Sequence, residues 1–213
     1  GTVYACGKNS GQLGIGGSSA QITVPEEIPS LSNIEKIFTG NYSSFFITEN
    51  DEVYVCGTNG SGELGTGTTN AVTSPTPLSI SDVIDISSKG DSTIFLKSDG
   101  KVYCCGGNSG GQFGLGNKTP VTTPKKVQIS DVQSIFAGQG FSLFLKKDFT
   151  VYVAGANNYG QIGLGDGIVN QLTFTKFPIT DVKTLSAGYT SCLLLKNDGS
   201  LHTWGDGTYG KLG

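Results

Sequence analysis

One short pattern recurs along the whole chain at a nearly constant spacing. It reads Val-Tyr-x-x-Gly, or Leu-His-x-x-Gly in the last copy, and its copies begin at Val3, Val53, Val102, Val151 and Leu201. Successive copies start 50, 49, 49 and 50 residues apart. Such a period is the signature of a repeat architecture, in which neighbouring units bury each other. We therefore expect one domain over residues 1–213, with repeats at approximately 3–52, 53–101, 102–150 and 151–200 and a partial copy at 201–213.

Each repeat contains the turn residues that separate the short strands of a sheet. After the Val-Tyr strand comes a glycine-rich turn, such as residues 57–65, whose Asn59 we expect to tolerate the left-handed region and to bond its own backbone. The proline-containing segment that follows suits an edge strand, because proline has no N–H to donate. An Asx residue such as Asp82 predicts the next turn, and apolar runs such as 94–96 fit strands covered on both faces. The hairpin sequence Asp99-Gly100 is typical of a type I′ turn.

About four short strands per repeat predict an all-β fold. One four-stranded sheet cannot bury both faces alone, and radial repetition stacks each sheet on the next. The predicted architecture is therefore a β-propeller with blades of four antiparallel strands. The first and last segments duplicate one another, and a closing ring would need them to be complementary. The chain also lacks Met and opens inside a strand pattern, so we expect about four blades of a larger ring in a longer protein.

Composition argues against several classes of function. The chain has 14 basic and 17 acidic side chains, a net charge of −3 and no basic cluster, which predicts no direct binding of nucleic acid by this segment. No stretch of 18 apolar residues occurs, so no membrane span is expected. The sequence does not start with a secretory signal, which favours an intracellular location without distinguishing cytoplasm from nucleus.

The candidate reactive groups do not form a catalytic constellation. Cys6, Cys56 and Cys105 occupy one repeat position, where we expect cysteine to act as a small, semi-buried hydrophobe. The one histidine, His202, stands where other repeats have Tyr, and the glycine-rich loops lack the G-K-[ST] and helix of a phosphate-binding loop. We expect no catalytic residue, no cofactor, no metal site and no enzyme activity in this segment.

The strand Val-Tyr-x-x-Gly, followed by Gly-x-Asn-x-x-Gly-Gln-[Leu/Phe/Ile]-Gly-x-Gly and closed by Asp-Gly-x-Val-Tyr, resembles the regulator of chromosome condensation repeat family. The resemblance covers the whole chain and implies a seven-bladed propeller, to which this chain would contribute about four blades. It implies a protein partner and, as an alternative function, guanine-nucleotide exchange on a small Ran-like GTPase. The repeats also occur beside kinase or ubiquitin-ligase domains, and in light sensors with clustered tryptophans, whereas this chain has Trp204 alone.

One set of loop residues varies between repeats while the frame around it stays constant. In the family, the two residues after a glycine that ends the inner strand commonly project onto the partner-binding face. The matching positions follow Gly40, Gly90, Gly138 and Gly188, and are Asn41, Tyr42, Asp91, Ser92, Gln139, Gly140, Tyr189 and Thr190. Variable residues on a constant frame suit recognition, and exposed Tyr is favoured at interfaces. We expect a protein–protein interaction module; the alternative is that these are ordinary turn residues.

Overall fold

The computed structural model describes residues 1–17, 21–165 and 169–213, and strands dominate these ranges. The strands are β1 (Tyr4–Lys8), β2 (Gln21–Glu27), β3 (Ile34–Thr39), β4 (Ser43–Thr48), β5 (Val53–Gly57), β6 (Val72–Leu78), β7 (Val83–Lys89), β8 (Ser92–Lys97), β9 (Val102–Gly106), β10 (Val121–Lys126), β11 (Val132–Gly138), β12 (Phe141–Lys146), β13 (Val151–Ala156), β14 (Asn170–Lys176), β15 (Val182–Ala187), β16 (Ser191–Lys196) and β17 (Leu201–Gly205). One turn of 3-10 helix, η1 (Thr208–Gly210), follows. None of the helical structure in the described ranges is long and apolar enough to cross a membrane.

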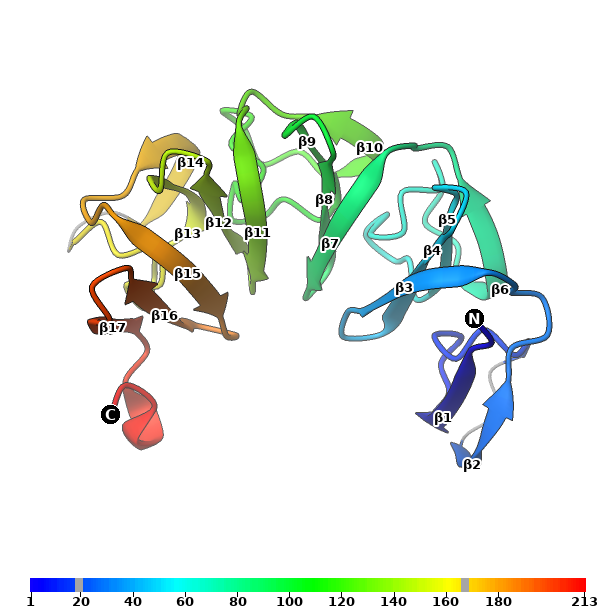
Figure 1. Cartoon of the computed structure of the whole chain (residues 1–213). Coiled ribbons are helices and arrows are strands. Elements are labelled where there is room, and N and C mark those ends of the chain that lie inside the picture. The colour runs from blue at the N-terminus through cyan, green and yellow to red at the C-terminus, as the bar shows by residue number, and fades with distance from the viewer. Residues whose placement is uncertain (18–20, 166–168) are drawn as a thin grey trace.

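The strands form antiparallel sheets that follow one another along an open arc (Figure 1). Three sheets have four strands each, β3–β6, β7–β10 and β11–β14, while β15–β17 form a three-stranded sheet and β1–β2 a pair. Consecutive strands are neighbours in every sheet, so each sheet is a meander. The predicted all-β blades of four antiparallel strands are confirmed.

The sheets are out of phase with the sequence repeats. A repeat counted from Val53 places β5 and β6 in one sheet and β7 and β8 in the next. The hairpin of residues 49–52 keeps β4 and β5 paired, whereas the equally short connection of residues 79–82 after β6 crosses to the neighbouring sheet. Each sequence repeat therefore links two blades.

The first strands of successive blades, β3, β7, β11 and β15, line the concave side of the arc (Figure 1). The Ala137 N–H of β11 donates to Ser87 Oγ of β7 at 2.9 Å, which joins two of them directly. The outermost strands β6 and β10 contain Pro75 and Pro124, as expected for edge strands.

The hydrophobic core lies between neighbouring sheets. Phe45 of β4 and Phe95 of β8 are both 0% exposed, and their rings meet edge to face with centroids 6.2 Å apart. Each such buried side chain contributes about 1.5–3 kcal/mol through removal of apolar surface from water. Because this core belongs to two sheets at once, one blade cannot be formed without its neighbour.

The hairpin turns differ from the prediction. A type I′ turn needs positive φ at both central residues, but at Asp99-Gly100 only the glycine has one, 78°. The Lys97 carbonyl accepts the Gly100 N–H at 2.9 Å, so the turn spans residues 97–100 and the glycine follows as a left-handed bulge residue. Phe149 occupies the same place in the third blade with φ 62°.

The predicted turns between blades are confirmed at the Asx positions. Asn33, Asp82, Asp131 and Asp181 have φ between 53° and 62°, in the left-handed region that Asn and Asp tolerate best among residues with a side chain.

The asparagines of the glycine-rich loops bond the local backbone as predicted, but they do not adopt the left-handed conformation. Asn59 and Asn108 lack a positive φ and are 1% exposed. Asn108 Oδ1 accepts the Phe113 N–H at 3.1 Å, while its Nδ2 donates to the carbonyls of Asn117 and Thr119 at 3.0 and 3.2 Å. The amide therefore clamps the two ends of the loop together, because it can accept and donate at once.

The cysteine position also does more than fill space. Cys56 and Cys105 are 0% exposed, and their Sγ atoms donate to the Gln12 and Glu63 carbonyls of the preceding sheet at 3.4 and 3.3 Å. Trp204, at the same position of the last sheet, donates from Nε1 to the Gln161 carbonyl at 2.9 Å. Cys6 is exposed. In the third four-stranded sheet this position is Ala154, and there Ser142 Oγ of β12 donates to the Gln112 carbonyl across the blade boundary instead.

Candidate interaction face

The loops of two or three residues after β3, β7, β11 and β15 lie at one end of the sheets, next to the long glycine-rich loops. The carbonyl of the last loop residue accepts the N–H of the residue after the glycine of each Val-Tyr-x-x-Gly or Leu-His-x-x-Gly strand: Thr58 N–Tyr42 O is 2.8 Å, Gly107 N–Asp91 O is 2.7 Å, Ala156 N–Gly140 O is 2.8 Å and Asp206 N–Thr190 O is 2.9 Å. We call this end of the arc the loop face, defined by residues 41–42, 90–91, 139–140 and 189–190, by the loops after β5, β9 and β17, and by residues 157–165 after β13.

A glycine makes this close approach possible. A Cβ on Gly106, which has φ 105°, would lie 2.2 Å from the Asp91 carbonyl oxygen. No side chain can be placed there without moving the backbone. The frame of the loop face is thus set by steric exclusion as well as by hydrogen bonds.

Several predicted residues do project from the loop face. Tyr42 is 51% exposed, Tyr189 is 56% exposed and Asn41 is exposed. Thr190 is half-buried and its Oγ1 donates to Asp206 Oδ2 at 3.3 Å. These side chains come from the loops of the first and last complete inner-strand hairpins, β3–β4 and β15–β16.

Asp91 is held between two blades. Its Oδ2 accepts from Ser61 Oγ of the preceding sheet's glycine-rich loop at 3.2 Å, and its carboxylate lies against Gly107 of its own sheet. The side chain is half-buried. Asp91 therefore offers a carboxylate with a fixed position.

The placement of Ser92 on this face is wrong. Ser92 pairs with Gly106 as Ser43 pairs with Gly57, so it is the first residue of β8 and not a loop residue. It is 1% exposed, and its Oγ donates to the Lys89 carbonyl at 3.2 Å. The equivalent of Gly40 is Lys89, one residue before the glycine that the sequence suggested. Because side chains of a strand alternate between its two faces, aligning Gly90 with Gly40 shifted the prediction by one residue. The shift predicted exposure for a side chain that is buried.

Gln139 is a bridging residue more than an exposed one. Its N–H donates to the Tyr189 carbonyl of the next sheet at 3.1 Å, and its side chain packs over Gly90 of the previous one. Its buried Oε1 has no hydrogen-bond partner in the described part of the chain. Gln139 therefore links the sheets on either side of its own.

Two tyrosines of the glycine-rich loops were missed. Tyr159 is 58% exposed and Tyr209 is 100% exposed, each four residues after the glycine that ends its third strand. Ser61 occupies the same position and reaches Asp91, which places this position at the loop face. The sequence signal for them is the Tyr that recurs at this loop position in the last two copies.

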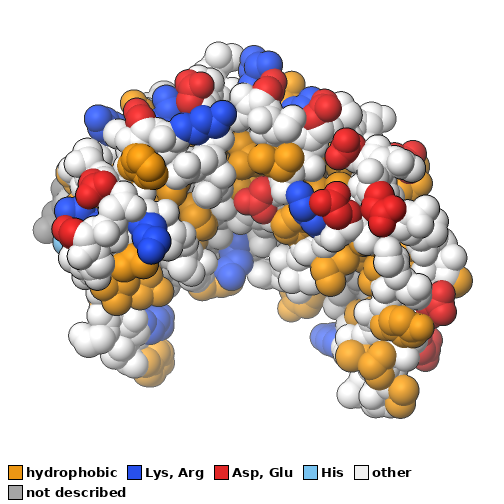
Figure 2. All heavy atoms as spheres, viewed as in Figure 1, with side chains coloured by type: hydrophobic (Ala, Val, Ile, Leu, Met, Phe, Trp, Pro, Cys, Tyr) orange, Lys and Arg blue, Asp and Glu red, His pale blue; other side chains and the backbone are white. Residues whose placement is uncertain are grey.

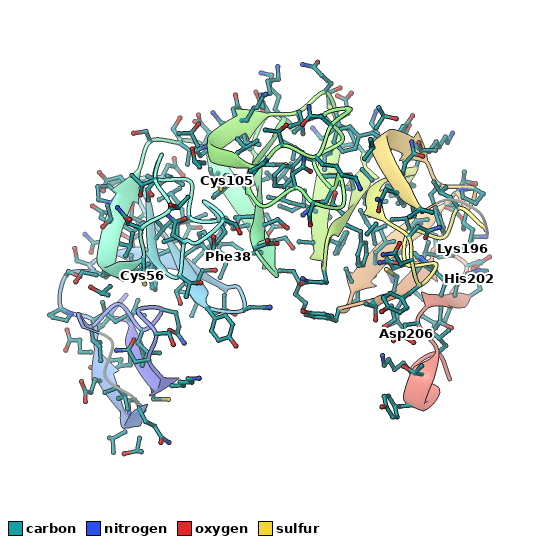
Figure 3. The ribbon with its side chains drawn as sticks, turned by 180° about the vertical axis from the view of Figure 1, so that it is seen from behind. Phe38, Cys56, Cys105, Lys196, His202 and Asp206 are labelled. Atoms are coloured by element: carbon teal, nitrogen blue, oxygen red, sulfur yellow. The ribbon has the colours of Figure 1, made fainter. Side chains whose placement is uncertain are left out.

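The described residues contain no group of three or more His, Cys, Asp and Glu side chains that could hold a metal ion. His202 lies in β17 opposite Leu194, and Figure 3 shows it beside the strand that carries Lys196. Burial raises the pKa of Cys56 to about 12 and that of Cys192 to about 12, so both thiols are protonated at neutral pH. A protonated, buried thiol is a poor nucleophile.

Two family models match the amino-acid sequence along most of the chain. The model of the regulator of chromosome condensation (RCC1) repeat matches residues 1–47, 50–96 and 99–145, and a second model of the same repeat matches 34–63, 83–112 and 182–211. The chain belongs to the regulator of chromosome condensation repeat family. The two sets of limits differ in phase, as the sheets and the sequence repeats do.

Solved propellers of this family share the fold. The RCC1-repeat chain is 24% identical to human WBSCR16, with a TM-score of 0.82 over 96% of this chain and 56% of that one. It is 23% identical to yeast RCC1 (Prp20), solved bound to Kap60, with a TM-score of 0.84 over 97% and 52% of the two chains. Prp20p of Saccharomyces cerevisiae, described with its binding to Gsp1p and histones, is 22% identical, with a TM-score of 0.83 over 96% of this chain and 54% of that one. The chain thus spans about half the length of these structures.

Proposed function

We propose that this RCC1-repeat chain is a protein–protein interaction module that uses the loop face. The observation that carries the proposal is the set of exposed tyrosines on that face, Tyr42, Tyr159, Tyr189 and Tyr209, which stand on loops fixed by glycines and backbone hydrogen bonds. Tyrosine buries a large area at low cost in side-chain entropy and is enriched among residues that dominate binding energy.

The test removes side chains without touching the frame. A triple variant Tyr42→Ala, Asp91→Ala and Tyr189→Ala is compared with a control triple Tyr4→Ala, Glu26→Ala and Phe149→Ala. The control also removes two exposed aromatics and one acid, but outside the loop face. We expect partners captured by the wild-type chain to be lost from the first variant and retained by the control, with both variants folded by circular dichroism. Equal capture by both would refute the assignment of this face.

Guanine-nucleotide exchange on a small Ran-like GTPase is the second candidate. It is favoured by Asp91, whose fixed carboxylate is available to a basic side chain of a GTPase, and by likeness in fold to Prp20, whose structure is described with its binding to Gsp1p. Release of a fluorescent guanine nucleotide from a panel of small GTPases tests it. Acceleration that disappears with Asp91→Ala would support exchange, and absence of acceleration across the panel would exclude it.

A further inference from the structure

A groove lies between the first and second four-stranded sheets, at the end opposite to the loop face. It has a volume of about 550 Å³ and is bordered by the β4–β5 hairpin, the β6–β7 connection and β9. Its lining includes Asp51, Glu52, Pro77, Leu78, Ile80 and Tyr103. We call it the acidic groove.

Among the described residues, no cationic side chain forms an ion pair with Asp51 or Glu52 of the acidic groove. Both residues are exposed. The one lysine of the lining, Lys97, is already engaged: its Nζ lies 3.4 Å from Asp82 and 5.5 Å from the centroid of the Tyr103 ring. The groove therefore presents negative charge beside an apolar floor.

Charge is distributed unevenly along the arc. Nine acidic and two basic side chains precede residue 86, whereas eight acidic and twelve basic side chains follow it. In Figure 2 acidic side chains predominate on the side of the arc that holds β3–β6, and most lysines lie towards the other end. The field of the N-terminal part reinforces the local charge of the groove.

The next blade boundary shows that this charge is particular to the first one. Asp51 and Glu52 correspond to Gly100 and Lys101 in the next hairpin, and Pro77 corresponds to Lys126 in β10. The same backbone thus carries acids and proline at one boundary and lysines at the next. The frame does not require acidic residues there.

We propose that the acidic groove binds an extended peptide segment of a partner protein in which a Lys or Arg lies next to an aliphatic side chain. The cation pairs with Asp51 and Glu52, and the aliphatic side chain packs on Pro77, Leu78 and Ile80. This second binding surface is independent of the loop face. Charge complementarity selects a basic partner. The apolar floor favours a peptide segment with an aliphatic side chain over a free cation.

The test measures binding of a defined probe to the full chain by fluorescence anisotropy. The probe is a fluorescein-labelled nonapeptide, Gly-Lys-Leu-Lys-Gly-Lys-Leu-Lys-Gly. Comparison peptides replace every Lys by Glu or every Leu by Ser. We expect saturable binding that weakens about tenfold in the double variant Asp51→Asn, Glu52→Gln, corresponding to about 1.4 kcal/mol, and weaker binding of both comparison peptides.

A matched control separates the groove from the overall charge. The variant Glu26→Gln, Glu27→Gln changes the net charge by the same amount at exposed positions of β2. We expect its affinity to stay within about twofold of wild type. The proposal is overturned if the probe does not bind, if both double variants weaken binding equally, or if the Ser peptide binds as tightly as the Leu peptide.

Discussion

Thr58 Oγ1 donates a hydrogen bond to Glu63 Oε1 at 3.1 Å across the base of a glycine-rich loop. In the next sheet the same two positions are Gly107 and Gln112, and there Gln112 Nε2 donates to the Gly107 carbonyl at 2.8 Å. In the last sheet they are Asp206 and Lys211, whose side chains form an ion pair of 2.6 Å. One contact is thus made in three chemical forms: Glu63 and Lys211 pair with a side chain at the first position, whereas Gln112 pairs with a backbone carbonyl that any residue there supplies.

This relationship predicts strong coupling between Thr58 and Glu63. Thr58→Ala should lower the free energy of unfolding of the wild-type chain by about 1–2 kcal/mol. The reason is that the Glu63 carboxylate loses a hydrogen-bond donor, and Glu63 is only 6% exposed. In a Glu63→Gln background the same change should cost under about 0.5 kcal/mol, since Gln can donate to the backbone as Gln112 does. Urea unfolding of the four chains measures the cycle. An identical cost in both backgrounds would contradict the prediction.

The asparagine clamp predicts a large effect from one small truncation. Asn108→Ala removes an acceptor and two donations inside a buried loop, so we expect a loss of about 2–3 kcal/mol in the free energy of unfolding. Asn41→Ala, at an exposed loop position, serves as control and should change it by less than about 0.5 kcal/mol. Thermal unfolding followed by circular dichroism distinguishes the two, and equal shifts would argue against the clamp.

The hairpin bulge predicts substitutions of opposite sign at equivalent positions. Phe149 has φ 62° and is 45% exposed, so Phe149→Gly should raise the free energy of unfolding by about 1 kcal/mol through relief of left-handed strain. Gly100→Ala should lower it by about 1–2 kcal/mol, since its Cβ would meet the Asp131 backbone at 3.3 Å. Chemical denaturation measures both. Destabilisation by Phe149→Gly would show that the ring contributes more than the strain costs.

The buried thiols predict slow alkylation and a loss of stability in alkali. Cys6 is exposed and should react with iodoacetamide in the folded chain, whereas Cys56 and Cys192 should react only after unfolding. Folding raises the pKa of each of these two thiols from 9.0 to about 12, so the folded state holds the proton more tightly. The contribution of each thiol to the free energy of unfolding is therefore fully present below pH 9 and falls as the pH rises towards 12.

The size of that alkaline loss can be checked by removing one thiol. Titration of each thiol on unfolding should lower the free energy of unfolding by on the order of 1 kcal/mol between pH 8 and pH 10. Unfolding of wild type and Cys56→Ala at both pH values measures it. We expect a smaller loss in the variant, and an unchanged loss would show that Cys56 does not titrate on unfolding.

The repeat period, together with the turn residues and short apolar runs inside each copy, predicted the strands, the meander and the stacking of blades. A 49- to 50-residue unit with short apolar runs and glycines cannot bury its strands except against its own copies. The Asx turns and the edge prolines also followed from sequence, because left-handed φ and a missing N–H are properties of single residues.

Tertiary structure decided the rest, because it depends on atoms that are distant in sequence. Pairing with Gly106 buries Ser92, and the Glu63 carbonyl across a blade boundary gives the Cys105 thiol an acceptor. Asn108 became a clamp because two carbonyls nine and eleven residues away converge on it. The period determined which residues form the frame. Only the register between strands and the contact between sheets determined which loop side chains reach solvent.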